Sequence, residues 1–249
     1  MKTKMMKIYW AKLALRIAIF ITVLGIYIYD KTILMTLLLQ PVYMGINRMH
    51  LLWIGFMYMM VSHLKPKEPF TMACLKGMGS KFDPVENYDQ VKLFEYTKQQ
   101  NVAAWKVMLI WMAGNGIVGI LHAIEILTDA DLIMLSVFYF LCDYICILFY
   151  CPFQSHIMKN KCCVNCRIYD WGHFMMFTPM LFINSFFSLS LFFTAAVVLI
   201  HWELIYAKYP ERFYSGSNKR LQCANCNDKT CQMKNKLKSK FKNNIQTQL

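Results

Sequence analysis

Long apolar windows that carry almost no charge recur along this chain, and they restrict it to folds made of whole apolar helices. Several windows of 18 or more residues contain hardly any Asp, Glu, Lys or Arg. One α-helix needs about 20 such residues to cross the hydrocarbon core of a bilayer. Hydrophobic residues make up 57% of the chain and charged residues 16%, whereas soluble domains are about a quarter charged. The sequence therefore predicts an all-α, polytopic integral membrane protein.

Five apolar segments mark the expected membrane-spanning parts of this bundle. Four belong to an N-terminal unit at residues 1–152, and they cover about 8–29, 49–62, 103–127 and 132–150; the fifth covers 174–206. The first segment is too long for a secretory signal, and Lys12 and Arg16 interrupt it without a small-residue cleavage site. We therefore expect a retained first span in a multi-pass protein of the cell membrane.

Basic residues indicate how the chain is oriented. Lys and Arg gather in four regions: the N-terminus, the loop at 63–102, the loop at 153–173 and the tail at 207–249. The loops at 30–48 and 128–131 are poor in both residues. Because cytoplasmic loops are enriched in Lys and Arg, all four basic regions and both termini are expected to be cytoplasmic. The basic tail is also expected to attract anionic lipid.

The segment at 174–206 leaves the number of spans open between five and six. It would make about 50 Å of helix, whereas two full spans need about 40 residues. It is either a short hairpin, or a half-helix broken near Pro179 and Asn184 and followed by a full span that would put the tail outside. The segment at 33–47 is similarly ambiguous. We favour six crossings with both termini inside.

Two Cys-x-x-Cys motifs indicate a site built from thiols. Cys163 and Cys166 lie in the loop at 153–173, and Cys223 and Cys226 lie in the tail. A two-residue spacer lets two thiolates reach one metal ion, so two such turns can complete a tetrahedral shell. These four cysteines are the predicted metal ligands. The possible additional ligands are Cys151, Cys162 and Cys231, and the expected neighbours that orient the thiolates are Asp170 and His173.

Three kinds of chemistry fit this cysteine pattern. A closed four-cysteine zinc site would tie the tail to the loop. An iron–sulfur cluster also takes four thiolates, although the compact ferredoxin spacing is missing. In the third, the two motifs form a relay that exchanges electrons through mixed disulfides.

Four ionisable residues fall within the expected spans. Arg16, His122, Glu125 and Asp143 would be costly in contact with lipid and usually face a bundle interior or a water-filled path. One interpretation is a shared polar core in which Arg16 pairs with the acids. The alternative places His122 and Glu125 near the outer interface, in contact with headgroups and water.

Several function classes lack their sequence signatures. We find no phosphate-binding loop, dinucleotide fingerprint or His-Glu-x-x-His helix, and no nucleophile elbow. The net charge of +13 is explained by basic residues that flank membrane segments, so nucleic acid is an unlikely partner even for the Lys-rich stretch at 234–242.

The leading hypothesis is an integral membrane metalloprotein with one four-cysteine centre, zinc or iron–sulfur, that serves membrane redox chemistry or electron transfer. One alternative is a transporter or structural membrane protein whose tail is tied to a loop by structural zinc. A further alternative is a membrane thiol–disulfide oxidoreductase. The sequence names neither the substrate nor the electron-transfer partner.

Overall fold

Local capping interactions set the ends of the long helices. Asp89 accepts hydrogen bonds from the backbone N–H groups of Val91 and Lys92, at 2.9 and 3.1 Å, and so starts the helix that follows. Thr128 and Asp131 form a capping box at the start of the next helix, where the Thr128 backbone N–H lies 2.7 Å from Asp131 Oδ2. These two caps fix the residues at which the two following helices begin.

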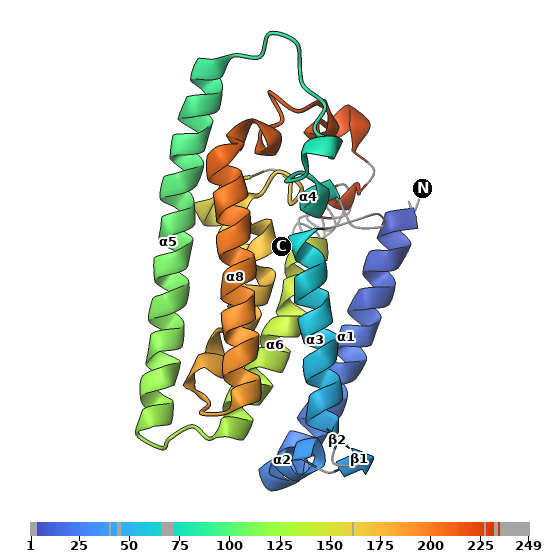
Figure 1. The fold of residues 1–249 in the computed structure, drawn as a ribbon, viewed down its shortest axis with the longest axis vertical. Helices are drawn as coiled ribbons and strands as arrows, with labels where there is room; N and C mark the ends of the chain where they lie inside the picture. Colours follow the sequence, from blue (N-terminus) through green and yellow to red (C-terminus); the bar gives the residue numbers. More distant parts are fainter. Residues whose placement is uncertain are drawn as a thin grey trace, which may run out of the picture.

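The computed structural model describes residues 4–39, 41–43, 46–65, 72–160, 162–226, 228–231 and 234. In this part of the chain the regular secondary structure is helical apart from one short antiparallel strand pair and an isolated bridge between Pro84 and Asn218 (Figure 1). The α-helices are α1 (Lys4–Tyr29), α2 (Lys31–Leu39), α3 (Arg48–Leu64), α4 (Met72–Leu75), α5 (Gln90–Ala123), α6 (Asp129–Leu148), α7 (Gly172–Phe177) and α8 (Phe186–Lys208). The strands are β1 (Pro41–Tyr43) and β2 (Ile46–Asn47). The shorter helical turns are η1 (Gly79–Lys81), η2 (Phe153–Ile157), η3 (Arg167–Trp171), η4 (Thr178–Phe182), η5 (Pro210–Phe213), η6 (Lys219–Leu221) and η7 (Cys223–Asn225).

Four of the described helices are long and apolar enough to cross a bilayer, namely α1, α5, α6 and α8. Their outer faces carry exposed apolar side chains, and Ile21, Leu109 and Leu204 are each more than 60% exposed. Apolar faces of this extent suit contact with lipid tails rather than water. The helical architecture and four spans of this kind agree with the membrane bundle expected from the sequence.

Helix α5 is longer than the apolar run that predicts it. It begins at Gln90 rather than near 103 and has 34 residues, which is about 51 Å at 1.5 Å per residue. The Asp89 cap and the helix-favouring Gln, Lys and Glu residues that follow extend the helix into the expected loop. In Figure 1 the first turns of α5 extend beyond the ends of the other long helices, next to the loops at that end of the bundle.

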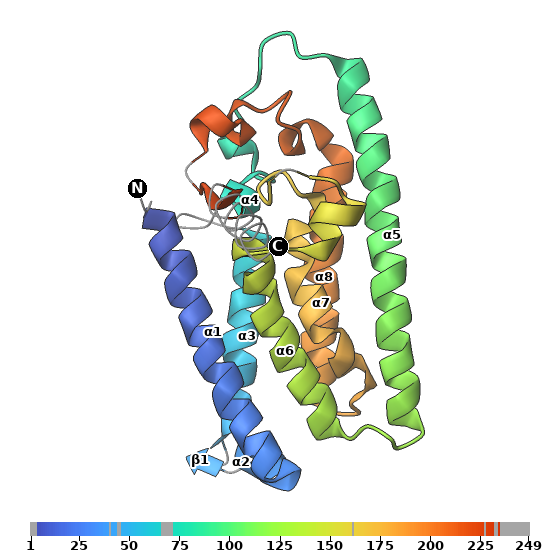
Figure 2. The same cartoon turned by 180° about the vertical axis from the view of Figure 1, so that it is seen from behind.

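The chain runs back and forth between two ends of the bundle (Figures 1 and 2). One end, here called the cysteine end, carries the start of α1, the described part of the loop before α5 (72–89), residues 151–160 and 162–166, and residues 210–226. The opposite end carries α2, the β1–β2 pair and the turn between α5 and α6. The described parts of the segment at 33–47, namely 33–39, 41–43 and 46–47, therefore lie at the opposite end, and α3 returns from it to the cysteine end.

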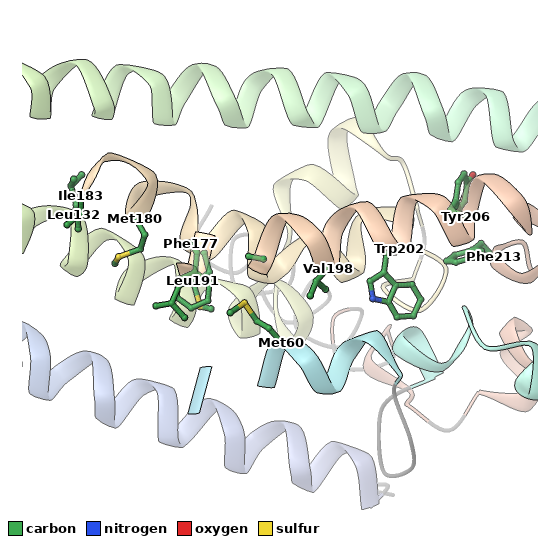
Figure 3. Packing of buried hydrophobic residues seen from close by; sticks show 12 residues of the cluster. Met60, Leu132, Phe177, Met180, Ile183, Leu191, Val198, Trp202, Tyr206 and Phe213 are labelled. Carbon is green, nitrogen blue, oxygen red and sulfur yellow. The ribbon is translucent and has the colours of Figure 1, made fainter. Parts of the chain in front are cut away.

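The segment at 174–206 is broken into two antiparallel parts. Helix α7 continues into the 3₁₀ turn η4, which contains Pro179, and the chain then reverses at 183–185 into α8. Ile183 belongs to the same buried cluster as Leu132, near the start of α6, so the first part reaches the opposite end (Figure 3). Helix α8 then returns. The two cysteine motifs consequently lie at the same end of the bundle.

The largest buried cluster joins α3, α6, α7 and α8. Figure 3 shows Met60, Phe177, Leu191 and Val198 together in the interior, and the cluster continues to Trp202 toward the cysteine end. A second cluster joins α5 to η3, α7 and α8, and a third joins α1 to α6. The broken segment α7–η4 is thus held between two clusters, which fixes the loop that precedes it.

A close helix contact at Gly119 gives the first testable prediction. A Cβ atom at Gly119 of α5 would lie 2.3 Å from Phe182 Cε1, whereas one at Gly116 meets nothing within 4 Å. Both substitutions to alanine bring the same gain in helix propensity. We expect Gly119→Ala to lower the free energy of unfolding by about 1–3 kcal/mol through overpacking, and Gly116→Ala to leave it unchanged or higher. Thermal unfolding in detergent measures both, and equal melting temperatures would contradict this packing.

Candidate thiol-lined site

The first Cys-x-x-Cys motif is a tight turn at the cysteine end. The backbone N–H of Cys166 donates to the carbonyl oxygen of Cys163 at 3.0 Å, and η3 starts directly afterwards. Both side chains are buried, and both line one cavity. The turn therefore presents its two thiols to a shared space inside the protein.

Lys76 holds this turn from the loop between α3 and α5. Its ammonium group donates to the carbonyl oxygens of Val164 at 3.2 Å and Cys166 at 2.7 Å. The Lys76 side chain is completely buried, so its charge lies in a low-dielectric surrounding close to the motif. A buried ammonium group at this position favours negative charge on nearby thiols.

Glu203 of α8 anchors the other flank of the turn. Trp171 Nε1 donates to Glu203 Oε1 at 2.9 Å, and Arg167 forms an ion pair with the same carboxylate. Arg167 also stacks over the ring of Tyr206, with 4.2 Å between its guanidinium carbon and the ring centroid. Two separate elements therefore hold the cysteine turn in place, which limits its freedom to move.

Asp170 pairs with Lys76, the residue that holds the cysteine turn. Its carboxylate is 3.9 Å from Lys76 Nζ and is buried. Burial raises the pKa of Asp170 to about 6, although the charge of Lys76 opposes the shift. Asp170 thus belongs to the clamp that fixes the turn, through Lys76.

The raised pKa of Asp170 predicts a specific pH dependence of stability. Because the folded state binds the Asp170 proton more tightly than the unfolded state, stability is greatest below the ordinary pKa of 3.8 and falls as the pH rises toward about 6. The loss is about 3 kcal/mol, since one pKa unit is about 1.4 kcal/mol. We expect Asp170→Asn to remove this loss. The melting temperature of the variant minus that of the natural protein should therefore increase as the pH rises from 4 to 6.5. A constant difference across this range would contradict the assignment.

A cavity of about 430 Å³ lies between α5, α6, η2 and the cysteine turn. Cysteines from three segments line it: Cys142, Cys146, Cys151, Cys163 and Cys166. The remaining wall is largely aromatic and aliphatic, and includes Trp111, Phe138, Tyr139 and Phe153. The cavity thus places five thiols around an apolar space between membrane helices. This cavity is the candidate functional site.

Polar contacts inside this cavity converge on Cys163. Its thiol donates to Gln154 Oε1 at 3.1 Å, and Lys234 Nζ lies 2.9 Å from its sulfur. Lys234 also donates to the same Gln154 oxygen at 2.8 Å. The backbone N–H of Gln154 donates to Cys151 Sγ at 3.4 Å. Gln154 therefore contacts both Cys151 and Cys163 and links the two thiols.

The thiols of the site differ in acidity. Burial raises the pKa of Cys163, and it raises the pKa of Cys166 to about 12, while the charges of Lys234 and Lys76 respectively oppose these shifts. Cys151 is the opposite case, because a hydrogen bond from the Cys146 thiol lowers its pKa to about 6. Cys151 is therefore the more acidic thiol of the three, since burial shifts the pKa values of Cys163 and Cys166 in the opposite direction.

The second motif forms a similar turn at the surface. The backbone N–H of Cys226 lies 3.5 Å from the carbonyl oxygen of Cys223, and the Cys223 side chain is exposed. Burial raises the pKa of Cys162 to about 12, and the neighbouring charges of Cys231, Cys163 and Cys226 add to the shift. Cys226 and Cys231 of the tail therefore lie within electrostatic range of Cys162.

The four predicted metal ligands are distributed over two places. Cys163 and Cys166 face the inner cavity, and Cys223 is at the surface of the tail. In the described ranges, no group of three or more His, Cys, Asp or Glu side chains is placed to hold a metal ion. The four-cysteine centre therefore stays a prediction.

The ionisable residues predicted within the spans separate into two pairs. Arg16 of α1 donates to Asp143 of α6, with 2.8 Å between Nη1 and Oδ2. His122 and Glu125 lie at the turn between α5 and α6, where His122 Nε2 is 3.4 Å from Asp129 Oδ1 and Glu125 has a positive φ of 62°. A polar core shared by all four residues is therefore wrong, because α5 ends its helix at this turn.

Asp143 and Arg16 line a second cavity of about 420 Å³ between α1, α3, α6 and α7. His173 also lines this cavity, and its Nε2 is 3.4 Å from His63 Nδ1. Asp143 and Gly172 line both cavities, and a Cβ atom at Gly172 would lie 2.9 Å from Asp143 Oδ1. The glycine thus allows the carboxylate to sit between the two spaces.

Several residues of the site escape sequence reasoning. Lys76 and Gln154 carry no motif, and their roles depend on contacts with residues far along the chain. The sequence does indicate that Cys142 and Cys146 lie on one face of a helix, because they are four residues apart, and Cys151 follows shortly afterwards. The spacing of these cysteines is the signal that points to the cavity.

Comparison with protein-family models, with curated proteins and with solved structures found no match, so the interpretation of this site depends on its own geometry.

Proposed function

We propose that this chain is an integral membrane thiol–disulfide oxidoreductase in which Cys163 and Cys166 alternate between dithiol and disulfide. The observation that carries the proposal is their shared position: both thiols belong to one tight turn and line one apolar cavity beside membrane helices. A Cys-x-x-Cys turn suits reversible disulfide formation because its two sulfur atoms are close in the chain. Lys76 and Lys234 supply positive charge for the thiolate forms.

Cys151 is the attacking thiolate in this proposal. Exchange needs a thiolate, and a pKa near the ambient pH gives the best attacking group. Cys151 attacks Cys163 in the Cys163–Cys166 disulfide, which forms a Cys151–Cys163 disulfide and releases Cys166 as a thiolate close to Lys76. Attack by Cys166 on Cys163 reverses the step. Electrons thus move between inner thiols without any change in the total number of sulfur–sulfur bonds.

The tail motif supplies the outward contact of the same relay. Cys223 is exposed, and Cys226 is close enough to Cys162 for their charges to interact. We propose that Cys223 and Cys226 exchange a disulfide with a partner protein and pass it to the loop. This arrangement is supported by the common location of both motifs at the cysteine end (Figure 1).

The proposed orientation places the cysteine end in the cytoplasm. Four described helices, α1, α5, α6 and α8, are long and apolar enough to cross a bilayer, and we propose that α3 and the broken segment α7–η4 complete six crossings. An even number of crossings would put both termini on one side, and the basic residues favour the cytoplasm. Anionic lipid is the proposed partner of the basic tail, whose residues at 235–249 lie outside the described part.

A test of the function is a map of the disulfides that form under mild oxidation. The full chain, purified in detergent without oxygen, is treated with oxidised glutathione, alkylated, digested and analysed by mass spectrometry. We expect a Cys163–Cys166 disulfide that a dithiol reverses. Cys163→Ser should abolish it, and Cys223→Ser should retain it. Persistent thiols at both positions, after oxidation of other cysteines, would refute the proposal.

A four-cysteine metal centre is the second candidate, favoured by the proximity of Cys162, Cys226 and Cys231. In this second proposal Cys163, Cys166, Cys223 and Cys226 are the ligand set, with Cys162 and Cys231 as substitutes, and the tail would move to bring both motifs to one metal ion. Zinc would then fasten the tail to the loop, or an iron–sulfur cluster would transfer electrons. Visible absorption with acid-labile sulfide identifies the cluster, and a colourless protein with about one zinc identifies the structural site.

A further inference from the structure

The walls of the thiol-lined cavity are suited to an aromatic ligand. Trp111 packs directly against Tyr139, with 4.7 Å between ring centroids and 54° between ring planes, and it meets Phe153 edge to face at 6.0 Å. All three residues line the cavity, whose volume of about 430 Å³ is in the range of small-molecule sites. Flat rings stack well on such walls. The space thus fits a planar, apolar ring system.

The rim of the cavity lies on the outer face of a membrane span. Phe138 and Ile145 of α6 both line the cavity and are exposed, at 45% and 36% of their surfaces. Since α6 is long and apolar enough to cross a bilayer, this rim would contact lipid rather than water. A ligand dissolved in the membrane can therefore reach the cavity sideways, whereas a water-soluble one meets an apolar entrance.

The floor of the cavity carries the redox groups. Cys163 and Cys166 are both buried and line the inner wall, so a ligand in the cavity would lie against the dithiol. The Tyr139 side chain also lines the cavity, and its hydroxyl can donate a hydrogen bond to a ring oxygen, whereas the Gln154 amide nitrogen already donates to the carbonyl oxygen of Asn160 at 3.0 Å. A ring with carbonyl oxygens and an apolar body matches all these features.

We propose that the cavity binds a lipid-soluble quinone, which accepts two electrons from the Cys163–Cys166 dithiol. The inference depends on the proposed thiol–disulfide function and names its electron acceptor. One sulfur–sulfur bond forms, the two thiols lose one proton each, and the quinone gains two electrons and two protons to become the quinol. The dithiol is oxidised and the quinone is reduced, so atoms and electrons balance.

The test uses a decyl-substituted benzoquinone as the probe. Full-length protein is reduced with a dithiol, desalted without oxygen and mixed with the quinone; quinone absorbance and the Cys163–Cys166 disulfide are followed together. We expect one disulfide for each quinol formed. A covalent protein–quinone adduct in place of the disulfide, or no quinol, would overturn the inference.

Variants that fill the cavity test where the quinone binds. Met175 of α7 lines the cavity, so Met175→Trp should slow oxidation by the quinone at least tenfold. Ile145→Trp at the rim offers a second obstruction in case the first variant does not fold. Ile200 of α8 is 56% exposed away from the cavity lining, and Ile200→Trp is the matched control with an unchanged rate. Equal rates in all folded variants would overturn the inference.

A soluble oxidant distinguishes failure of this inference from failure of the proposed function. Oxidised glutathione needs no apolar cavity, so it should oxidise the dithiol at similar rates in the natural protein and in Met175→Trp. A dithiol that reacts with glutathione disulfide but not with the quinone would refute the quinone and retain the oxidoreductase. A dithiol that neither oxidant converts to a disulfide would refute both.

Discussion

Arg16→Met is expected to destabilise the protein by about 3 kcal/mol, because it leaves the Asp143 carboxylate, whose side chain is 30% exposed, without its partner in the bundle. Arg16 donates to Asp143 at 2.8 Å, and its guanidinium carbon lies 3.9 and 4.0 Å from the ring centroids of Phe140 and Tyr144. These contacts join α1 to α6. A carboxylate left alone at this depth is costly.

The double variant Arg16→Met/Asp143→Leu provides the control. Removing both charges leaves no unpaired group, so most of the lost stability should return. Asp143→Leu alone should also be less stable than the double variant. Unfolding in detergent at a fixed pH measures the four proteins of this cycle. Additive effects of the two single changes would show that the pair contributes no coupling.

Cys151 is expected to react with iodoacetamide at least about 100 times faster than Cys166 at pH 7. A pKa of about 6 makes Cys151 largely thiolate, while a pKa of about 12 leaves Cys166 almost fully protonated. The greater nucleophilicity of the less acidic thiol offsets part of this difference, with a Brønsted slope of about 0.4–0.5. Mass spectrometry of single peptides, taken over time, gives both rates.

The hydrogen bond from Cys146 is the cause to be tested. Cys146→Ala removes the donor and should move the pH midpoint of Cys151 labelling upward, whereas Cys146→Ser keeps a donor and should retain most of the effect. A midpoint that stays the same in the alanine variant would show that Lys234 or the backbone, and not Cys146, controls the acidity of Cys151.

The sequence predicts the long helices well because their signal is local. Apolar runs and the Thr128 cap mark α6 closely, from Asp129 to Leu148 against an expectation of 132–150. The start of α5 is less readable, because Asp89 begins a helix while the following residues are still polar. The hydropathy pattern locates only the apolar part of a helix. The start of the helix depends also on the capping residue and on the helix propensity of the polar residues that follow it.

The break within 174–206 shows what a one-dimensional pattern leaves open. Pro179 predicts an interruption, but the same residues fit a hairpin or a half-helix. Packing decides between them: Phe177 and Met180 contact the cluster that also contains Leu191 and Ala195 of α8, so the two parts lie antiparallel. This contact joins separate elements of the fold, so no local sequence pattern predicts it.

The candidate site was only partly predictable for a similar reason. The Cys163–Cys166 motif is visible in the sequence, and Arg16 and Asp143 were recognisable as ionisable groups that needed partners. The meeting of His63 with His173, which are 110 residues apart, has no sequence signal. Equally, nothing local distinguishes buried Cys163 from exposed Cys223, since both start a Cys-x-x-Cys turn with Asn as the second spacer residue.

A redox titration of the Cys163–Cys166 pair tests the central claim most directly. The full chain is equilibrated in thiol–disulfide buffers of known potential, quenched in acid, alkylated and measured by peptide mass. We predict that both thiols disappear together in one two-electron transition, with a tenfold change in ratio for each 30 mV or so. The transition should persist in a Cys223→Ser/Cys226→Ser variant and after treatment with a chelator. Its absence in the natural protein, or its loss together with bound metal in that variant, would contradict the thiol–disulfide account and favour the four-cysteine metal centre.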